Sequence, residues 1–130
     1  DVEKRKHLMS RAKAVLVPTY SIGPFEGVSI EAMMSGTPVI TTDWGAFPEN
    51  VIHGVTGYRC RTMEQFEWAV RNIEMIRPGD CRRWAIDNYS MDRVALMYDE
   101  YFSMLSDIIG GKGWYQENAG RENLDWLKKG

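Results

Sequence analysis

The chain has little of what marks disulfide-bonded, membrane-spanning and nucleic-acid-binding proteins. It has only two cysteines in 130 residues, Cys60 and Cys81, and they form no Cys-x-x-Cys pair, so we expect reduced, non-functional thiols. No apolar run approaches bilayer length, and residues 1–13 carry no signal-peptide core. The net charge of −2, without a block of Lys or Arg, argues against a nucleic-acid partner. These absences favour a cytoplasmic protein.

Histidine is equally scarce. His7 and His53 are isolated, with no carboxylate or second histidine at ligand spacing, so we expect solvated or turn-stabilising roles and no metal site. The remaining composition, 44% hydrophobic and 26% charged, is typical of a globular domain. A chain of this length can bury one hydrophobic core.

Strands and helices are expected to alternate along the chain. Strands are predicted at 14–17, 38–42 and 58–60, where β-branched and apolar residues form short runs, and the unbroken run at 14–17 suggests burial on both faces. Helices are predicted at 3–13, 28–35, 47–52, 63–76 and 80–89, and from 90 to about 108, from apolar spacing. Asp80 and Ser90 are expected to cap helix starts, and Gly36 to end the helix at 28–35.

This alternation implies βαβ units and a parallel sheet. The expected fold class is α/β, a partial Rossmann-like sheet flanked by helices, because about three strands are fewer than a complete doubly wound domain has. Glycines at 110, 111 and 113 interrupt the last long helix, so we expect a domain at 1–109 and a helical C-terminal extension at 110–130. We also expect residue 1 to be a boundary within a longer protein, unless another chain completes the sheet.

The most informative segment runs from Pro24 to Thr42, PFEGVSIEAMMSGTPVITT. It predicts a tight loop, a helix with Glu31 near its start, a Gly-Thr-Pro turn and a buried strand. A loop that leads into a helix N-terminus can hold an anion on backbone N–H groups. A carboxylate one turn further can accept hydrogen bonds from sugar hydroxyls. The segment therefore points to a phosphorylated sugar or a nucleotide as ligand.

Ordinary structural explanations compete at each position. Glu31 alone could be a favourable charge near a helix start, worth less than about 1 kcal/mol. Gly27 could be a turn glycine or a place where a phosphate approaches the backbone closely. Phe25 is better explained as packing that fixes the loop than as a stacking platform. For Asp43, after the strand at 38–42, loop solvation is the favoured role.

Together with its neighbours, the segment resembles the donor-binding core of family-4 (group 1) retaining glycosyltransferases of the GT-B fold. Ser35-Gly36-Thr37-Pro38 matches that family's small-Gly-x-Pro turn. The loop 45–49 matches its Gly-rich loop with a Glu, and 53–57, HGVTG, its (Asp/His)-Gly-x-Thr-Gly turn. The match covers residues from about 8 to 59, and the motifs occur in the family's order. Several linked motifs are specific, whereas any one alone is weak.

The resemblance implies a transferase that moves a sugar from a nucleotide-sugar donor, such as a UDP- or GDP-sugar, to a hydroxyl acceptor with retention. Donor binding would fall to Phe25, Glu26, Gly27, Val28 and Glu31, with Glu31 at the ribose. No metal or other cofactor is expected. The resemblance places an N-terminal acceptor domain, and Arg and Lys partners of the pyrophosphate, before residue 1. The isolated chain should then not turn over, and use of lipid-linked acceptors would place it at the inner membrane face.

The chain departs from the family at the first of its two glutamates, which are separated by seven residues. The position eight before Glu31 is Gly23, and Glu26 stands where the family usually has glycine. Glu26 is the remaining candidate for a catalytic carboxylate, but its spacing from Glu31 does not fit without a rebuilt loop. A carboxylate about 4 Å from a phosphate costs about 1–4 kcal/mol, and a positive φ adds about 1–2 kcal/mol. We therefore expect impaired donor binding.

Two other hypotheses remain. The first is a non-catalytic, degenerate transferase half that acts as a binding or oligomerisation module, with a homo-oligomer formed through the open sheet edge. The second is a nucleotide-binding domain of unrelated chemistry, which the linked motifs disfavour. A melting shift with UDP, GDP or ADP favours the transferase. A stable dimer that ignores nucleotide sugars favours the module.

Overall fold

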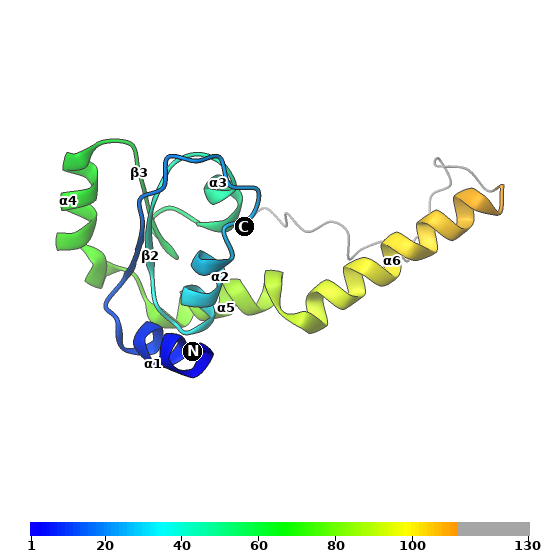
Figure 1. The fold of residues 1–130 in the computed structure, drawn as a ribbon, viewed down its shortest axis with the longest axis horizontal. Helices are drawn as coiled ribbons and strands as arrows, with labels where there is room; N and C mark the ends of the chain where they lie inside the picture. Colours follow the sequence, from blue (N-terminus) through cyan, green and yellow to red (C-terminus); the bar gives the residue numbers. More distant parts are fainter. Residues whose placement is uncertain (112–130) are drawn as a thin grey trace. The chain divides into compact units, whose positions relative to one another are not determined.

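The computed structural model describes residues 1–111, and Figure 1 draws them in sequence colours. The described residues divide into two units, 1–86 and from 87 onwards. The predicted boundary between 109 and 110 stays a prediction, because nearly all of the expected helical extension lies outside the described residues.

The first unit is built on a parallel sheet. Its strands are β1 (Val15–Val17), β2 (Val39–Thr42) and β3 (Gly57–Cys60), in the order β1-β2-β3. Val15 pairs with Val39, which in turn pairs with Gly57. All four residues of the central strand β2 are buried, as the β-branched run PVITT predicts. The α/β, Rossmann-like fold class is confirmed.

Helices cover both faces of this sheet. The helices α2 (Gly27–Met34) and α3 (Phe47–Asn50) lie on one face and α4 (Met63–Arg71) on the other (Figure 1). The core of the unit contains Met33, Ile40 and Phe47, which are almost inaccessible to solvent. The helices α1 (Val2–Arg11) and α5 (Pro78–Tyr89) complete the unit, although the last residues of α5 extend past it.

The turn that ends α2 is formed as the sequence predicts. Gly36 has a φ of 78°, and its N–H bonds to the carbonyl of Met33 at 2.9 Å, while the Thr37 N–H reaches that of Ala32 at 2.9 Å. This pair of bonds is the Schellman motif, which favours glycine at the left-handed position. The buried Thr37 hydroxyl donates to the Met9 carbonyl at 2.6 Å, so the same turn also fixes α1.

Two expectations about local structure are wrong. Leu16 is 53% exposed, so β1 is not buried on both faces, because it is an edge strand that the described residues leave partly uncovered. The helix predicted at 63–76 ends at Arg71, and a 3₁₀ turn follows at Ile73–Met75. The Asn72 side-chain amide donates to the Trp68 carbonyl at 2.8 Å, a local bond of the kind that competes with the helix ladder.

The expected caps of the last two helices have different outcomes. Ser90 caps α6 (Met91–Ile109), and its hydroxyl accepts from the Arg93 N–H at 3.3 Å. Asp80 instead lies within the first turn of α5, which begins with Pro78, a residue suited to the first helical position. None of the helices in residues 1–111 is long and apolar enough to cross a membrane.

Candidate functional site

Two loops meet at the carboxyl edge of the sheet. One follows β1 and leads to α2, and the other follows β2 and leads to α3. The Thr19 carbonyl of the first loop accepts from the Thr42 hydroxyl at 2.7 Å and from the Trp44 indole N–H at 3.2 Å. This edge is where open α/β sheets bind ligands, and the Thr19 carbonyl is one of the groups that join its two loops.

Glycine allows the second loop to lie against the first. Gly45 has a φ of 63°, and a Cβ there would lie 3.1 Å from the Gly23 carbonyl oxygen. The Ala46 N–H donates to that same oxygen at 3.2 Å. Further along, the Asn50 amide donates to the Phe25 carbonyl. The Gly-rich loop at 45–49 therefore supports the backbone of 23–25.

Glu26 has an uncommon backbone conformation. It immediately precedes α2 with φ 56° and ψ 61°, and no other non-glycine residue among those described has a positive φ. This left-handed conformation costs a residue with a Cβ about 1–2 kcal/mol. The positive φ considered for position 26 is thus present.

The Glu26 side chain folds back over Gly23. A Cβ built on Gly23 would lie 1.8 Å from Glu26 Oε1 and 2.6 Å from its carboxyl carbon. The carboxylate therefore fills the space that a side chain at position 23 would need. The side chain makes no capping bond to α2. The residue is half-buried, and among the described residues its carboxylate has no donor or ion-pair partner.

Of the other predicted loop residues, Gly27 and Val28 begin α2, and Phe25 precedes it. A Cβ at Gly27 would meet nothing within 4 Å, so the backbone there is open to approach. Val28 is 36% exposed and Phe25 46% exposed, so the Phe25 ring is not a core side chain. The first N–H groups of a helix lack partners within that helix, and these residues surround them.

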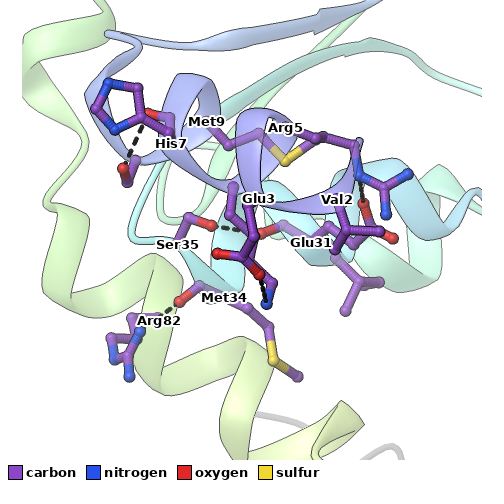
Figure 2. Close-up of a pocket in the computed structure, with 12 residues that line it drawn as sticks. Val2, Glu3, Arg5, His7, Met9, Glu31, Met34, Ser35 and Arg82 are labelled. Atoms are coloured by element: carbon purple, nitrogen blue, oxygen red, sulfur yellow. Dashed lines mark hydrogen bonds and ion pairs between the residues drawn. The ribbon is translucent and has the colours of Figure 1, made fainter.

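Glu31 borders a cavity of about 840 Å³ between α1 and α2, which Arg82 of α5 also lines (Figure 2). Its Oε2 lies 3.1 Å from Arg5 Nε, and both side chains are about half exposed. Arg82 donates to the Met34 carbonyl at 2.6 Å. The cavity lining combines charged or polar residues with apolar ones: Glu3, Arg5, Lys6, His7, Ser10, Glu31, Ser35 and Arg82, and Val2, Met9, Ile30 and Met34.

Sequence reasoning predicted Glu31 and missed its surroundings. Arg5 and Arg82 come from helices that are distant in sequence, and only the charge of the 3–13 helix gave a signal. With Lys6 they provide three cationic groups against the carboxylates of Glu3 and Glu31. Such a lining suits a ligand that has both polar and apolar parts. The described residues contain no group of three side chains that could hold a metal ion.

Asp43 is an anchor rather than a solvated loop residue, which corrects the favoured interpretation. Its two carboxylate oxygens lie 3.0 Å from Arg59 and 2.7 Å from Arg61, and its side chain is only 18% exposed. His53 stabilises the neighbouring turn, as expected, because its Nδ1 accepts from the Arg59 N–H at 3.0 Å. These contacts hold the ends of β2 and β3 together.

Both cysteines are free and buried. Burial raises the pKa of the Cys81 thiol to about 11, because a low-dielectric site disfavours the thiolate. Burial and the nearby Asp43 carboxylate raise the pKa of Cys60 as well. Neither thiol has the lowered pKa of a reactive cysteine.

Known proteins share part of this sequence. A sequence model of the family described as "Glycosyl transferases group 1" matches residues 1–76. The chain is 38% identical over 68 residues to a glycogen synthase of Mycobacterium tuberculosis, covering 51% of the chain and 16% of that protein. It is 40% identical over 67 residues to a D-inositol 3-phosphate glycosyltransferase of Nocardia farcinica, covering 52% of the chain and 15% of that protein.

A longer but weaker similarity is to an N-acetyl-alpha-D-glucosaminyl L-malate synthase of Bacillus anthracis. The identity is 28% over 94 residues, which covers 65% of the chain and 25% of that protein. The chain thus spans a quarter or less of the length of each of these relatives.

Proposed function

The chain belongs to the glycosyl transferases group 1 family, and on this premise we propose that it is the donor-binding portion of a family-4, retaining glycosyltransferase of the GT-B fold. The reaction is transfer of a sugar from a nucleotide-sugar donor to a hydroxyl acceptor. Each of the relatives is several times longer. We therefore place the acceptor site, and the cationic partners of the pyrophosphate, outside these 130 residues, and propose that the isolated chain does not turn over.

The observation that carries the proposal is the position of Glu31 at the rim of the α1–α2 cavity. At about 840 Å³, this cavity has the size of small-molecule sites and would receive the nucleoside. Arg5 pairs with Oε2 of Glu31, and a carboxylate has about four acceptor sites, so the ribose hydroxyls can still donate to it.

The diphosphate would bind at the start of α2. Gly27 is the first residue of this helix and Glu31 the fifth, so they are separated by about 6 Å along the axis, and one ligand can contact both. The first-turn N–H groups and the helix dipole favour an anion there. During transfer, the same groups would stabilise the negative charge that develops on the departing diphosphate. This step needs no metal.

The ribose contact can be measured by isothermal titration calorimetry with UDP, GDP and ADP and with the 2′,3′-dideoxy form of the nucleotide that binds best. The parent chain should prefer the ribonucleotide by about 10–100-fold, because hydrogen bonds to a charged group contribute about 1.5–3 kcal/mol. The Glu31→Gln variant should lose most of this preference.

The matched control is Glu67→Gln on α4, where Glu67 pairs with Arg71 in solvent, and its preference should equal the parent's. Failure of every nucleotide to bind would refute the donor-binding proposal. Equal affinities for the ribo and dideoxy forms in the parent would refute the role of Glu31 alone. The expectation that Gly23 weakens donor binding stays a prediction.

The alternative function, a non-catalytic oligomerisation module, is favoured by one observation. Among the described strands β1 pairs only with β2, and Leu16 on it is 53% exposed. An unpaired strand edge can accept a strand from another chain. Sedimentation that shows a stable dimer, abolished by Leu16→Lys and indifferent to nucleotides, would support the module.

We propose a cytoplasmic protein or one at the inner membrane face; vesicle co-sedimentation separates these locations.

A further inference from the structure

Gly23 and Glu26 compete for the same space. A Cβ on Gly23 would lie 1.8 Å from Glu26 Oε1, far inside any non-bonded contact. No left-handed φ is present at Gly23, so its backbone would accept alanine. A side chain at position 23 would therefore displace the neighbouring carboxylate, whereas the backbone of Gly23 itself does not require glycine.

The Glu26 carboxylate is free to act on a ligand. It is half-buried at the carboxyl edge of the sheet, and no described residue donates to it or pairs with it. An ionised carboxylate only accepts hydrogen bonds, and Coulomb repulsion disfavours a diphosphate next to it. The ligand group that suits this position carries hydroxyls and no negative charge.

We propose that Glu26 binds the sugar of the donor, taking the place of a side chain at position 23, and that Gly23 is required to make room for it. This inference rests on the proposed function and deepens it, because it separates a sugar contact at Glu26 from the nucleoside contact at Glu31. A glutamate and a glycine have exchanged positions in sequence, and the left-handed conformation of Glu26 returns the carboxylate to the vacated space.

The experiment measures how much the sugar adds to binding. Dissociation constants are determined for UDP and UDP-glucose and for GDP and GDP-mannose. We define the sugar gain as the dissociation constant of the free nucleotide divided by that of the corresponding nucleotide sugar. Glu26→Gln should reduce the sugar gain by about 10-fold or more, the loss expected for a charge-assisted hydrogen bond. The affinity for the free nucleotide should stay equal or rise.

Variants at position 23 test the shared space. Gly23→Ala should reduce the sugar gain as Glu26→Gln does, because the new Cβ displaces the carboxylate. In a Glu26→Gly background the same alanine should have no effect. The double variant Gly23→Glu/Glu26→Gly should restore the sugar gain to within about 3-fold of the parent's, a difference of less than about 0.7 kcal/mol. Glu67→Gln is again the control.

An unchanged sugar gain in Glu26→Gln would overturn the inference while leaving nucleotide binding, and hence the proposed function, intact. A double variant that binds the nucleotide sugar at least 10-fold more tightly than the parent would also overturn it, because Glu26 would then impair the donor site, as its spacing from Glu31 alone predicts. If the parent binds no nucleotide at all, the proposed function fails and this inference fails with it.

Discussion

Replacing Gly57 by alanine tests the register of the sheet. Gly57 begins β3 opposite Val39, and a Cβ there would lie 2.1 Å from the Val39 carbonyl oxygen and 2.9 Å from its carbon. The strand would have to withdraw, which also breaks the bond from the Val39 N–H to the Thr56 carbonyl, now 3.3 Å long. Overpacking costs about 1–3 kcal/mol and the lost hydrogen bond about 1 kcal/mol, so we expect about 2–4 kcal/mol.

Urea unfolding followed by circular dichroism measures this loss. With a slope of about 2 kcal/mol per molar urea, the middle of the usual range, the midpoint should fall by about 1–2 M. Gly79→Ala is the matched control, because a Cβ at this position in α5 meets nothing within 4 Å and alanine is favoured over glycine in a helix by about 0.5–1 kcal/mol. A Gly57→Ala variant as stable as the parent would refute the close approach of β3 to β2.

Three further outcomes are expected. Gly27→Ala should leave the free energy of unfolding equal or slightly higher, since the added Cβ faces open space. It should weaken nucleotide-sugar binding, because the diphosphate is proposed to approach this backbone. An unchanged affinity in calorimetry would mean that Gly27 is only a turn glycine. Arg5→Ala should lower the free energy of unfolding by less than about 1 kcal/mol, because the pair with Glu31 is half exposed, and a larger loss in urea would contradict this. The pKa of the Cys81 thiol is raised from 9.0 to about 11, and between these values the unfolded chain releases the proton more readily than the folded one. The contribution of this thiol to stability is therefore fully present below pH 9 and is lost as the pH rises towards 11, in total about 2–3 kcal/mol. A Cys81→Ala variant should lose less stability over this pH range than the parent.

Most of the fold could be predicted because its signals are local. The run PVITT has the β-branched residues of a buried strand, and the turn at 35–38 has glycine at the left-handed position where the chain turns after α2. Both features depend on neighbours within a few residues. The exposure of Leu16 and the interruption at Asn72 were missed, because the first depends on what covers an edge strand and the second on a side-chain bond that competes with the helix.

The candidate site divides in the same way. Glu31 was predicted from its position in a helix after a Gly-containing loop. Its partner Arg5 was not predicted, because the contact joins α1, which precedes β1 in the sequence, to α2, which follows it. The charged residues of α1 do not by themselves indicate which of them faces α2. Asp43 was misjudged because Arg59 and Arg61 reach it only after β3 pairs with β2.

The role proposed for Glu26 shows why spacing alone is an incomplete guide. A separation of five residues from Glu31 prevents a side chain from reaching the place of one at position 23 only if the intervening backbone is regular. One left-handed residue changes the direction of the chain and the side chain together, and this conformation is uncommon enough outside glycine that the sequence gives no reason to expect it.

The hydrogen bond from Trp44 to the Thr19 carbonyl gives the protein its own optical reporter. The indole emission depends on whether its N–H is bonded and on what lies near the ring, and here the Tyr20 ring is 5.8 Å away. Any ligand that shifts the loop after β1 must disturb this environment. Because the chain has five tryptophans, occupancy of the carboxyl edge can be followed by the difference in intrinsic fluorescence between the parent and a Trp44→Phe variant, without an added dye or a coupled reaction.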